Sequence, residues 1–297
     1  MITAIGLALL PVGIKYASGG AAAFQMNAPE WGDFSRWGLA LVVIFVALGF
    51  KFFTRGTMSS AAILIGLIAG YVVGYLTGAV NFGGVAKAAW FAVPEPFKYG
   101  IEFSAFAIIG MCLMSLVSAI ETVGDISGIA KGGANREATD KELSGGTYAD
   151  GFGSFIAGLF GGLPNTSFSQ NVGLISMTGV MSRSVVTLGA LFLVACGLIP
   201  KVGAVVAAMP ISVLGGGVIV MFGMVVSAGI NMLSGVNWNR RNMIILAMSL
   251  SVGLGIQAVP KSMQHLPDSF EMLMVSGLLP AAAISVILNL LIPKDID

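Results

Sequence analysis

The sequence predicts an all-α protein that crosses a membrane several times. Of its 297 residues, 56% are hydrophobic and only 10% are charged, whereas soluble domains carry about 25% charged residues. The 41 glycines and 16 methionines suit helices packed closely in lipid, where small residues let backbones approach. Apolar runs long enough to cross a hydrocarbon core, which takes about 20 residues per helix, recur along the chain.

The apolar windows give the order of the predicted helices. They lie at residues 2–16, 37–54, 58–79, 103–130, 183–200, 203–234, 240–260 and 270–292. Two shorter apolar pieces, 149–163 and 170–182, are separated by a polar run from Asn165 to Asn171, so we expect about ten segments. The most charged linker between the segments is 131–147.

Basic side chains are divided unequally between the two sides of these segments. If the 131–147 linker is cytoplasmic, that side holds nine of the fifteen Lys and Arg residues and the other side holds six. Cytoplasmic loops carry an excess of Lys and Arg. We therefore expect a multi-pass protein of the plasma (inner) membrane, with its C-terminal residues in the cytoplasm.

Several function classes lack their signatures here. The net charge of +1 gives no electrostatic case for binding nucleic acid. A membrane enzyme needs a nucleophile–base pair or metal ligands, but the one histidine, His265, lies between two apolar segments. No Gly-x-Ser-x-Gly or His-Glu-x-x-His motif occurs. We therefore predict no catalytic residue, metal or cofactor.

Acidic residues within apolar segments are the first candidates for a binding site, because a charge at the bilayer centre costs at least about 2.5 kcal/mol. Glu121 and Asp125 are four residues apart and so share one helix face. Asp150 lies near the start of the piece at 149–163. The alternatives are that Glu121 and Asp125 sit at a wet helix end, and that Asp150 is an N-terminal acid favoured by the helix dipole.

The stretch from Gly162 to Val180 is the second candidate. Pro164 interrupts a regular helix, and polar residues follow at once. Transporters place such interrupted helices near the bilayer midplane, with donors at the half-helix N-terminus facing the solute. Gln170 and Asn171 would lie there, and their amides suit a heterocycle with N–H and C=O edges. The alternative is a polar hairpin outside the membrane.

Three motifs in order resemble the nucleobase–ascorbate transporter family, also called nucleobase:cation symporter-2, and especially its bacterial xanthine and uric acid permeases. Gln170-Asn171-Val172-Gly173, with Thr178 five residues later, matches the family signature. SAIETVGDISG, which holds Glu121 and Asp125, resembles the eighth-helix motif. Tyr148-Ala149-Asp150-Gly151 resembles the start of the ninth helix. The likeness extends over essentially the whole chain.

The resemblance implies a role for each of these residues. Glu121 and Gln170 would bind a purine base, with Ser169 beside them and Asn171 shaping affinity. Asp125 and Asp150 would serve proton coupling or structural support. Gly173 and Thr178 belong to the signature. Because uracil-type members carry an acid at the position of Gln170, the resemblance favours a purine.

The resemblance also implies a fold of two inverted repeats of seven helices, divided into core and gate domains, and a homodimer. Residues 1–102 would end the first repeat, residues 103–182 would form core segments with the binding motifs, and residues 183–297 would supply the remaining gate and C-terminal helices. The eighth-helix motif follows only three segments here. We therefore expect that the first four helices are missing and that the chain does not transport by itself.

The sequence thus predicts a secondary transporter that imports xanthine or uric acid with protons. The alternatives are a permease for uracil or another nucleobase, and an anion transporter of the same architecture.

Overall fold

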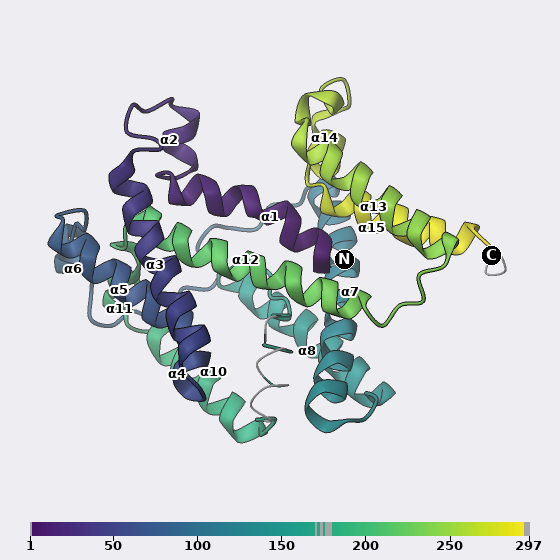
Figure 1. The fold of residues 1–297 in the computed structure, drawn as a ribbon, viewed down its shortest axis with the longest axis horizontal. Coiled ribbons are helices and arrows are strands. Elements are labelled where there is room, and N and C mark those ends of the chain that lie inside the picture. The colour runs from purple at the N-terminus through teal and green to yellow at the C-terminus, as the bar shows by residue number, and fades with distance from the viewer. Residues whose placement is uncertain (1, 170, 173–174, 176–179, 294–297) are drawn as a thin grey trace. The chain divides into compact units, whose positions relative to one another are not determined.

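The computed structural model describes all residues except 1, 170, 173–174, 176–179 and 294–297, so Gln170, Gly173 and Thr178 lie outside the described residues. The described residues form helices and no strands (Figure 1), which confirms the predicted all-α class. In chain order the helices are α1 (Ile2–Ala17), α2 (Ala21–Gln25), α3 (Phe34–Phe53), α4 (Thr57–Ser60), α5 (Ala62–Leu76), α6 (Gly83–Lys87), α7 (Ala105–Ala134), α8 (Asp140–Leu159), α10 (Arg183–Gly197), α11 (Pro200–Ala207), α12 (Ile211–Leu233), α13 (Arg240–Ala258), the 3₁₀ turn η1 (Pro260–Met263), α14 (Asp268–Val275) and α15 (Leu278–Leu291).

Three predicted windows are each divided into two helices, which corrects the segment boundaries. The window 58–79 contains α4 and α5, the window 203–234 contains α11 and α12, and the window 270–292 contains α14 and α15. Pro210 separates α11 from α12 because a proline has no N–H to donate and clashes with the preceding helical turn. Gly277 separates α14 from α15 with a φ of 71°, which favours glycine.

Over the described part of the chain, three helices are long and apolar enough to cross a membrane: α3, α7 and α13. Helices α10 and α11 meet at a bend of 86° and together would make a fourth span. Four shorter apolar helices lie at residues 3–17, 62–76, 211–227 and 278–291. The protein is therefore a multi-pass membrane protein, as its composition predicts.

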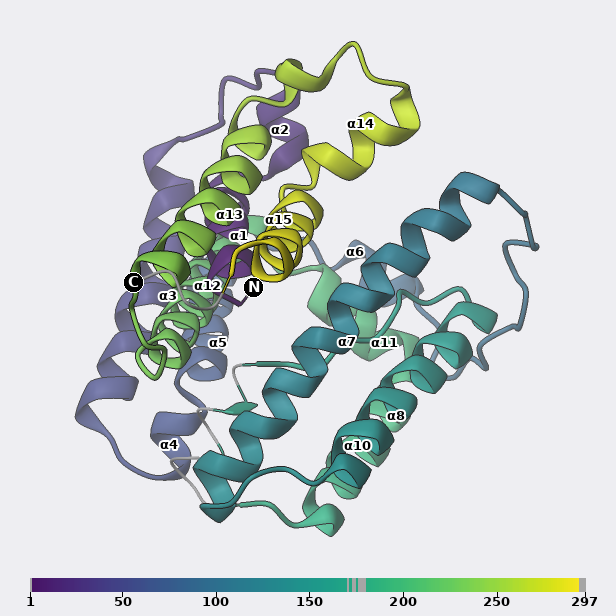
Figure 2. The same ribbon diagram turned by 90° about the vertical axis from the view of Figure 1, so that its right-hand side faces the viewer.

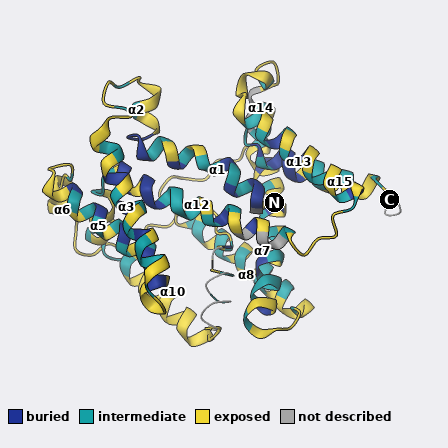
Figure 3. Cartoon of the chain, in the orientation of Figure 1, coloured by how far each residue is buried: buried dark blue, intermediate teal, exposed yellow. Residues whose placement is uncertain are grey.

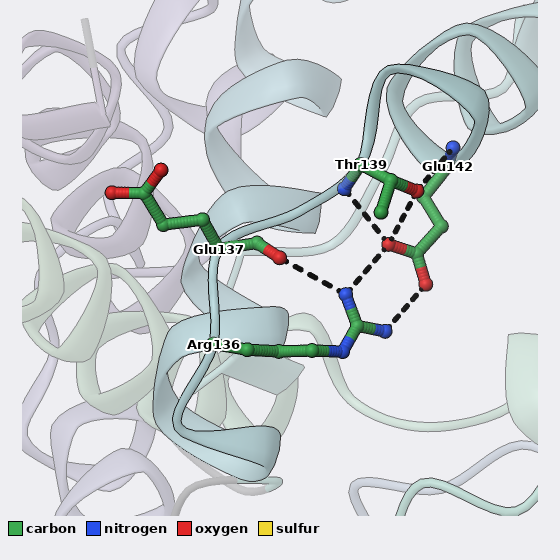
Figure 4. Close-up of polar contacts among 4 residues, drawn as sticks. All are labelled: Arg136, Glu137, Thr139 and Glu142. Atoms are coloured by element: carbon green, nitrogen blue, oxygen red, sulfur yellow. Dashed lines mark hydrogen bonds and ion pairs between the residues drawn. The ribbon is translucent and has the colours of Figure 1, made fainter.

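The predicted linker 131–147 is wrong in extent, because helix occupies most of it. Helix α7 continues to Ala134 and ends at Asn135, whose φ of 49° is left-handed. Helix α8 begins with a capping box, in which Thr139 and Glu142 each accept a bond from the other's backbone N–H. Arg136 donates to both carboxylate oxygens of Glu142, at 2.6 and 2.8 Å (Figure 4). Only residues 135–139 are therefore left to connect the two helices.

The chain forms two compact units. Unit 1 comprises residues 1–8, 96–176 and 224–297, and unit 2 comprises residues 9–95 and 177–223. The three-part division at 102/103 and 182/183 stays a prediction.

Unit 2 is built around the pair α3 and α5. Small residues, Ala62, Gly66, Gly70 and Gly74, recur every four positions of α5 and are buried. A Cβ added at Gly66 would lie 2.7 Å from the carbonyl oxygen of Val43 on α3, so the glycine permits this close approach. Elsewhere in unit 2, α10 exposes nearly all its side chains (Figure 3).

Unit 1 contains two helix pairs. Helices α7 and α8 lie side by side (Figure 2), and α13 packs along α15. Arg241, at the start of α13, is only 7% exposed. Its guanidinium donates to the carbonyl oxygens of Asn289 and Ile292, at 2.6 and 2.9 Å, and to the side-chain oxygen of Asn289. It thereby caps the C-terminal end of α15.

Candidate functional site

Glu121 and Asp125 lie in the interior of helix α7 and not at either of its ends. At 1.5 Å per residue the 30 residues of α7 measure about 45 Å. Both acids are at least nine residues from either end of the helix. Asp125 is 2% exposed, and Glu121 is half-buried. Two acids therefore lie on one face of a long apolar helix, as the spacing predicts.

Asp150 also lies within a helix, so the alternative of an N-terminal acid is wrong. Helix α8 starts at Asp140, ten residues before Asp150, and the helix dipole acts only within the first turn. The half-buried Asp150 instead faces α7. Its Oδ2 accepts from Ser118 at 3.2 Å and from Thr122 at 3.4 Å.

Residues 162–168 have no regular secondary structure, and the polar run within them lies against α7 and α8. Asn165 donates its backbone N–H to Ser154 Oγ on α8 at 2.9 Å, and Ser154 donates back to the Asn165 carbonyl. This exchange fixes the start of the run directly after the proline break. Helix α8 thus ends at Leu159, before the proline, and the run packs back on it through Ser154. The interrupted helix near the bilayer midplane stays a prediction.

The hydroxyls of the run converge on the acids of α7. Ser167 Oγ donates to Asp125 Oδ2 at 2.6 Å. Ser169 Oγ lies 3.0 Å from Asp125 Oδ2 and 3.2 Å from Glu121 Oε1. Ser169 is 5% exposed. The structure therefore brings Glu121, Asp125 and Ser169 together, as the motifs predict.

Of the remaining predicted site residues, the structure describes only Asn171. Asn171 is exposed, and its backbone N–H bonds the Phe168 carbonyl at 3.0 Å as a helical turn begins. Gln170, Gly173 and Thr178 fall outside the described residues. His265 lies exposed between η1 and α14, as its place between two apolar segments indicates. The described residues contain no group of three or more His, Cys, Asp or Glu side chains arranged to hold a metal.

Sequence reasoning missed the hydroxyls that join these acids. Thr122 Oγ1 lies 3.3 Å from Ser167 Oγ, and Ser118 Oγ lies 3.1 Å from Thr166 Oγ1. A signal was present, because Ser118, Glu121, Thr122 and Asp125 have the offsets 0, 3, 4 and 7 of a single helix face. Polar side chains thus form a continuous strip along an otherwise apolar helix.

Comparison with known proteins shows which family this chain is similar to. The model of a family described as "Permease family" matches residues 1–262. A xanthine permease of Bacillus subtilis is 35% identical over 98% of this chain and 65% of its own length. A uric acid permease of the same organism is 37% identical over 97% of this chain and 66% of its own length. A xanthine permease of Escherichia coli is 35% identical over 99% of this chain and 63% of its own length.

The chain thus spans less than two thirds of the length of these curated relatives. The match nevertheless includes every predicted site residue, from Glu121 to Thr178.

Proposed function

The chain belongs to the permease family of these xanthine and uric acid relatives, and on that premise we propose that it takes part in importing a purine base by proton symport. The observation that carries the proposal is the junction of Glu121 with the interrupted run, where Ser169 lies 3.2 Å from the Glu121 carboxylate. Gln170 is the next residue in the chain.

Xanthine and uric acid suit this pair of residues chemically. Both molecules are planar and carry ring N–H donors and C=O acceptors. The Glu121 carboxylate accepts from ring N–H groups, and the Gln170 amide both donates and accepts. Hydrogen bonds to an ionised partner contribute about 1.5–3 kcal/mol each. Asn171 would tune affinity from beside the ring.

Direct binding tests this assignment without requiring transport. The purified chain in lipid nanodiscs is titrated with radiolabelled xanthine, with unlabelled uric acid and uracil as competitors. We expect uric acid to compete and uracil to compete poorly. Strong competition by uracil would favour a pyrimidine permease instead.

Replacing Gln170 by Glu removes two donors, so it should weaken xanthine binding about tenfold or more, a loss of about 1.4 kcal/mol. Gln264→Glu is the matched control, because Gln264 is exposed in the loop after η1. It should leave binding unchanged. If Gln170→Glu binds xanthine as tightly as the control, Gln170 does not contact the base.

The setting of the protein is part of the same proposal. The excess of basic residues on the side of the short linker 135–139 supports a cytoplasmic C-terminus in the plasma membrane. Single cysteines introduced at Glu137 and at Gln264 should then react with impermeant reagents from opposite sides of the membrane. The resemblance to the family implies a homodimer. Cross-linking of the purified protein tests this oligomeric state.

A further inference from the structure

Residues 163–167, which lead to Ser169, are held in place by side chains. Within the described part of the chain, these residues make no backbone–backbone hydrogen bond, and the side chain that bonds their backbone is that of Ser154 on α8. Ser154 Oγ accepts from the Asn165 N–H at 2.9 Å and donates to the Asn165 carbonyl at 3.2 Å. One hydroxyl thus fixes both backbone groups of Asn165.

The chain returns to Ser154 because α8 ends in a tight turn. Gly161 has a φ of 70°, and its N–H bonds the Gly158 carbonyl at 3.1 Å. The N–H of Gly162 bonds the Ala157 carbonyl at 2.7 Å. These two bonds form the Schellman arrangement that closes many helix C-termini. The turn leads the chain back along α8 to the level of Ser154.

The Ser154 bonds select one register of the run on α8. The residue before Asn165 is Pro164, which has no N–H to give to Ser154. A slip that placed Pro164 there would leave Ser154 Oγ with a carbonyl alone. The side-chain amide of Asn165 also lies over Gly153, where a Cβ would come within 2.6 Å of Nδ2. Asn165 therefore fits this place on α8 and Pro164 does not.

The contacts of the run with α7 select a register less strictly. Thr166 Oγ1 lies 3.1 Å from Ser118 Oγ, and Ser167 Oγ lies 3.3 Å from Thr122 Oγ1. Each of these groups is a hydroxyl that can both donate and accept. One hydroxyl of the run could therefore replace another after a slip along α7.

We propose that Ser154 is a positioning residue for the purine site. It acts through Asn165, which it holds four residues before Ser169 and five before Gln170. In this register Ser169 Oγ lies 3.2 Å from Glu121 Oε1. The inference rests on the proposed function, because the register affects affinity only if these residues bind the base.

A disulfide measures the register without a purine. Cys112 and Cys196 are first replaced by Ala, and Ser118→Cys and Thr166→Cys are then introduced, because these two side chains are close enough to be bridged. In this background Ser154→Ala should slow formation of the 118–166 disulfide about fivefold or more. Ser154→Thr keeps the hydroxyl and should stay within about twofold. Alanine favours helix, so Ser154→Ala does not weaken α8 itself.

Xanthine binding to the chain with its own cysteines, in lipid nanodiscs, measures the consequence for the site. Ser154→Ala should weaken binding about fivefold or more, and Ser154→Thr should bind within about twofold of the unsubstituted chain. Ser144→Ala is the matched control, since Ser144 is an exposed serine of α8 whose hydroxyl bonds the Lys141 carbonyl. It should change neither measurement.

Three results would overturn the role of Ser154. The first is a disulfide that forms as fast in Ser154→Ala as in Ser144→Ala. The second is a slower disulfide with unchanged xanthine affinity. The third is an equal loss of affinity in Ser154→Ala and Ser154→Thr, because the hydroxyl would then not be the cause. If the unsubstituted chain binds no xanthine, the proposed function fails, and the disulfide rate still decides whether Ser154 sets the register.

Discussion

The guanidinium of Arg241 should be among the most important single groups for the stability of unit 1. It is 7% exposed and donates to Asn289 and Ile292 at the C-terminal end of α15, where carbonyl groups have no partner within the helix. Removing it leaves these oxygens unpaired, at about 1–3 kcal/mol each. It also removes a cation from the negative end of the helix dipole, at up to about 2 kcal/mol.

We therefore expect Arg241→Ala to lower the free energy of unfolding by about 3–5 kcal/mol, since these losses are not additive. Arg241→Lys keeps the charge but loses the planar fork, so about 1–2 kcal/mol should be lost. The measurement is denaturation of the purified chain in detergent, followed by size exclusion with fluorescence detection.

Arg240 supplies the control for this experiment, because it is adjacent and exposed. Arg240→Ala should change stability by less than about 0.5 kcal/mol. If the two alanine variants unfold alike, the bonds from Arg241 to α15 contribute nothing to the fold.

Two further predictions concern packing and pH. A Cβ at Gly253 of α13 would lie 2.6 Å from the Ala281 Cβ of α15, so Gly253→Ala should destabilise by about 1–3 kcal/mol in the same assay. At Gly255 a Cβ meets nothing within 4 Å, and Gly255→Ala should be neutral or stabilising; equal losses at both positions would contradict the packing. Hydrogen bonds from Arg136, then from Thr139, hold the pKa of Glu142 well below its usual value. The hydrogen bonds to the ionised Glu142 therefore stabilise the linker 135–139 at any pH above the unfolded pKa of about 4.5. This stabilisation is lost only as the pH falls through the lower pKa of Glu142 in the folded chain. Glu142→Gln should therefore raise the exchange rate of the Thr139 amide, relative to the unsubstituted chain, by the same factor at about pH 5 and at about pH 8. A factor that differed between the two pH values would refute the assignment.

Hydropathy found the apolar segments but not their breaks. The window 270–292 is apolar throughout, and the turn at Gly277 depends on the close packing of this glycine against α13, which no local pattern reveals. Pro210 was a visible signal within the window 203–234 and marks the division there. The linker 131–147 was overestimated for the opposite reason. Asp140, Lys141 and Glu142 form a charged first helical turn, and hydropathy cannot distinguish such a turn from a loop.

The candidate site was predictable to the extent that it depends on helix periodicity. The shared face of Glu121 and Asp125 follows from a spacing of four. The partners of Asp150 depend instead on how α8 packs along α7, so the sequence left its environment open. The serines of the polar run were expected to matter only near Gln170, yet Ser167 makes the shortest bond to Asp125.

The acids beside linkers and the acids of α7 and α8 differ in the kind of partner that each has. Among the described residues, the ion pairs Arg36–Glu30 and Arg136–Glu142 both lie beside linkers, where a fixed cation cancels each charge. Asp125 and Asp150 have hydroxyl partners instead. A hydroxyl can turn to donate to a carboxylate or to accept from a carboxylic acid, so it supports both protonation states. A permanent guanidinium partner would support only the ionised state. The acids of α7 and α8 are therefore held by partners that fit either protonation state.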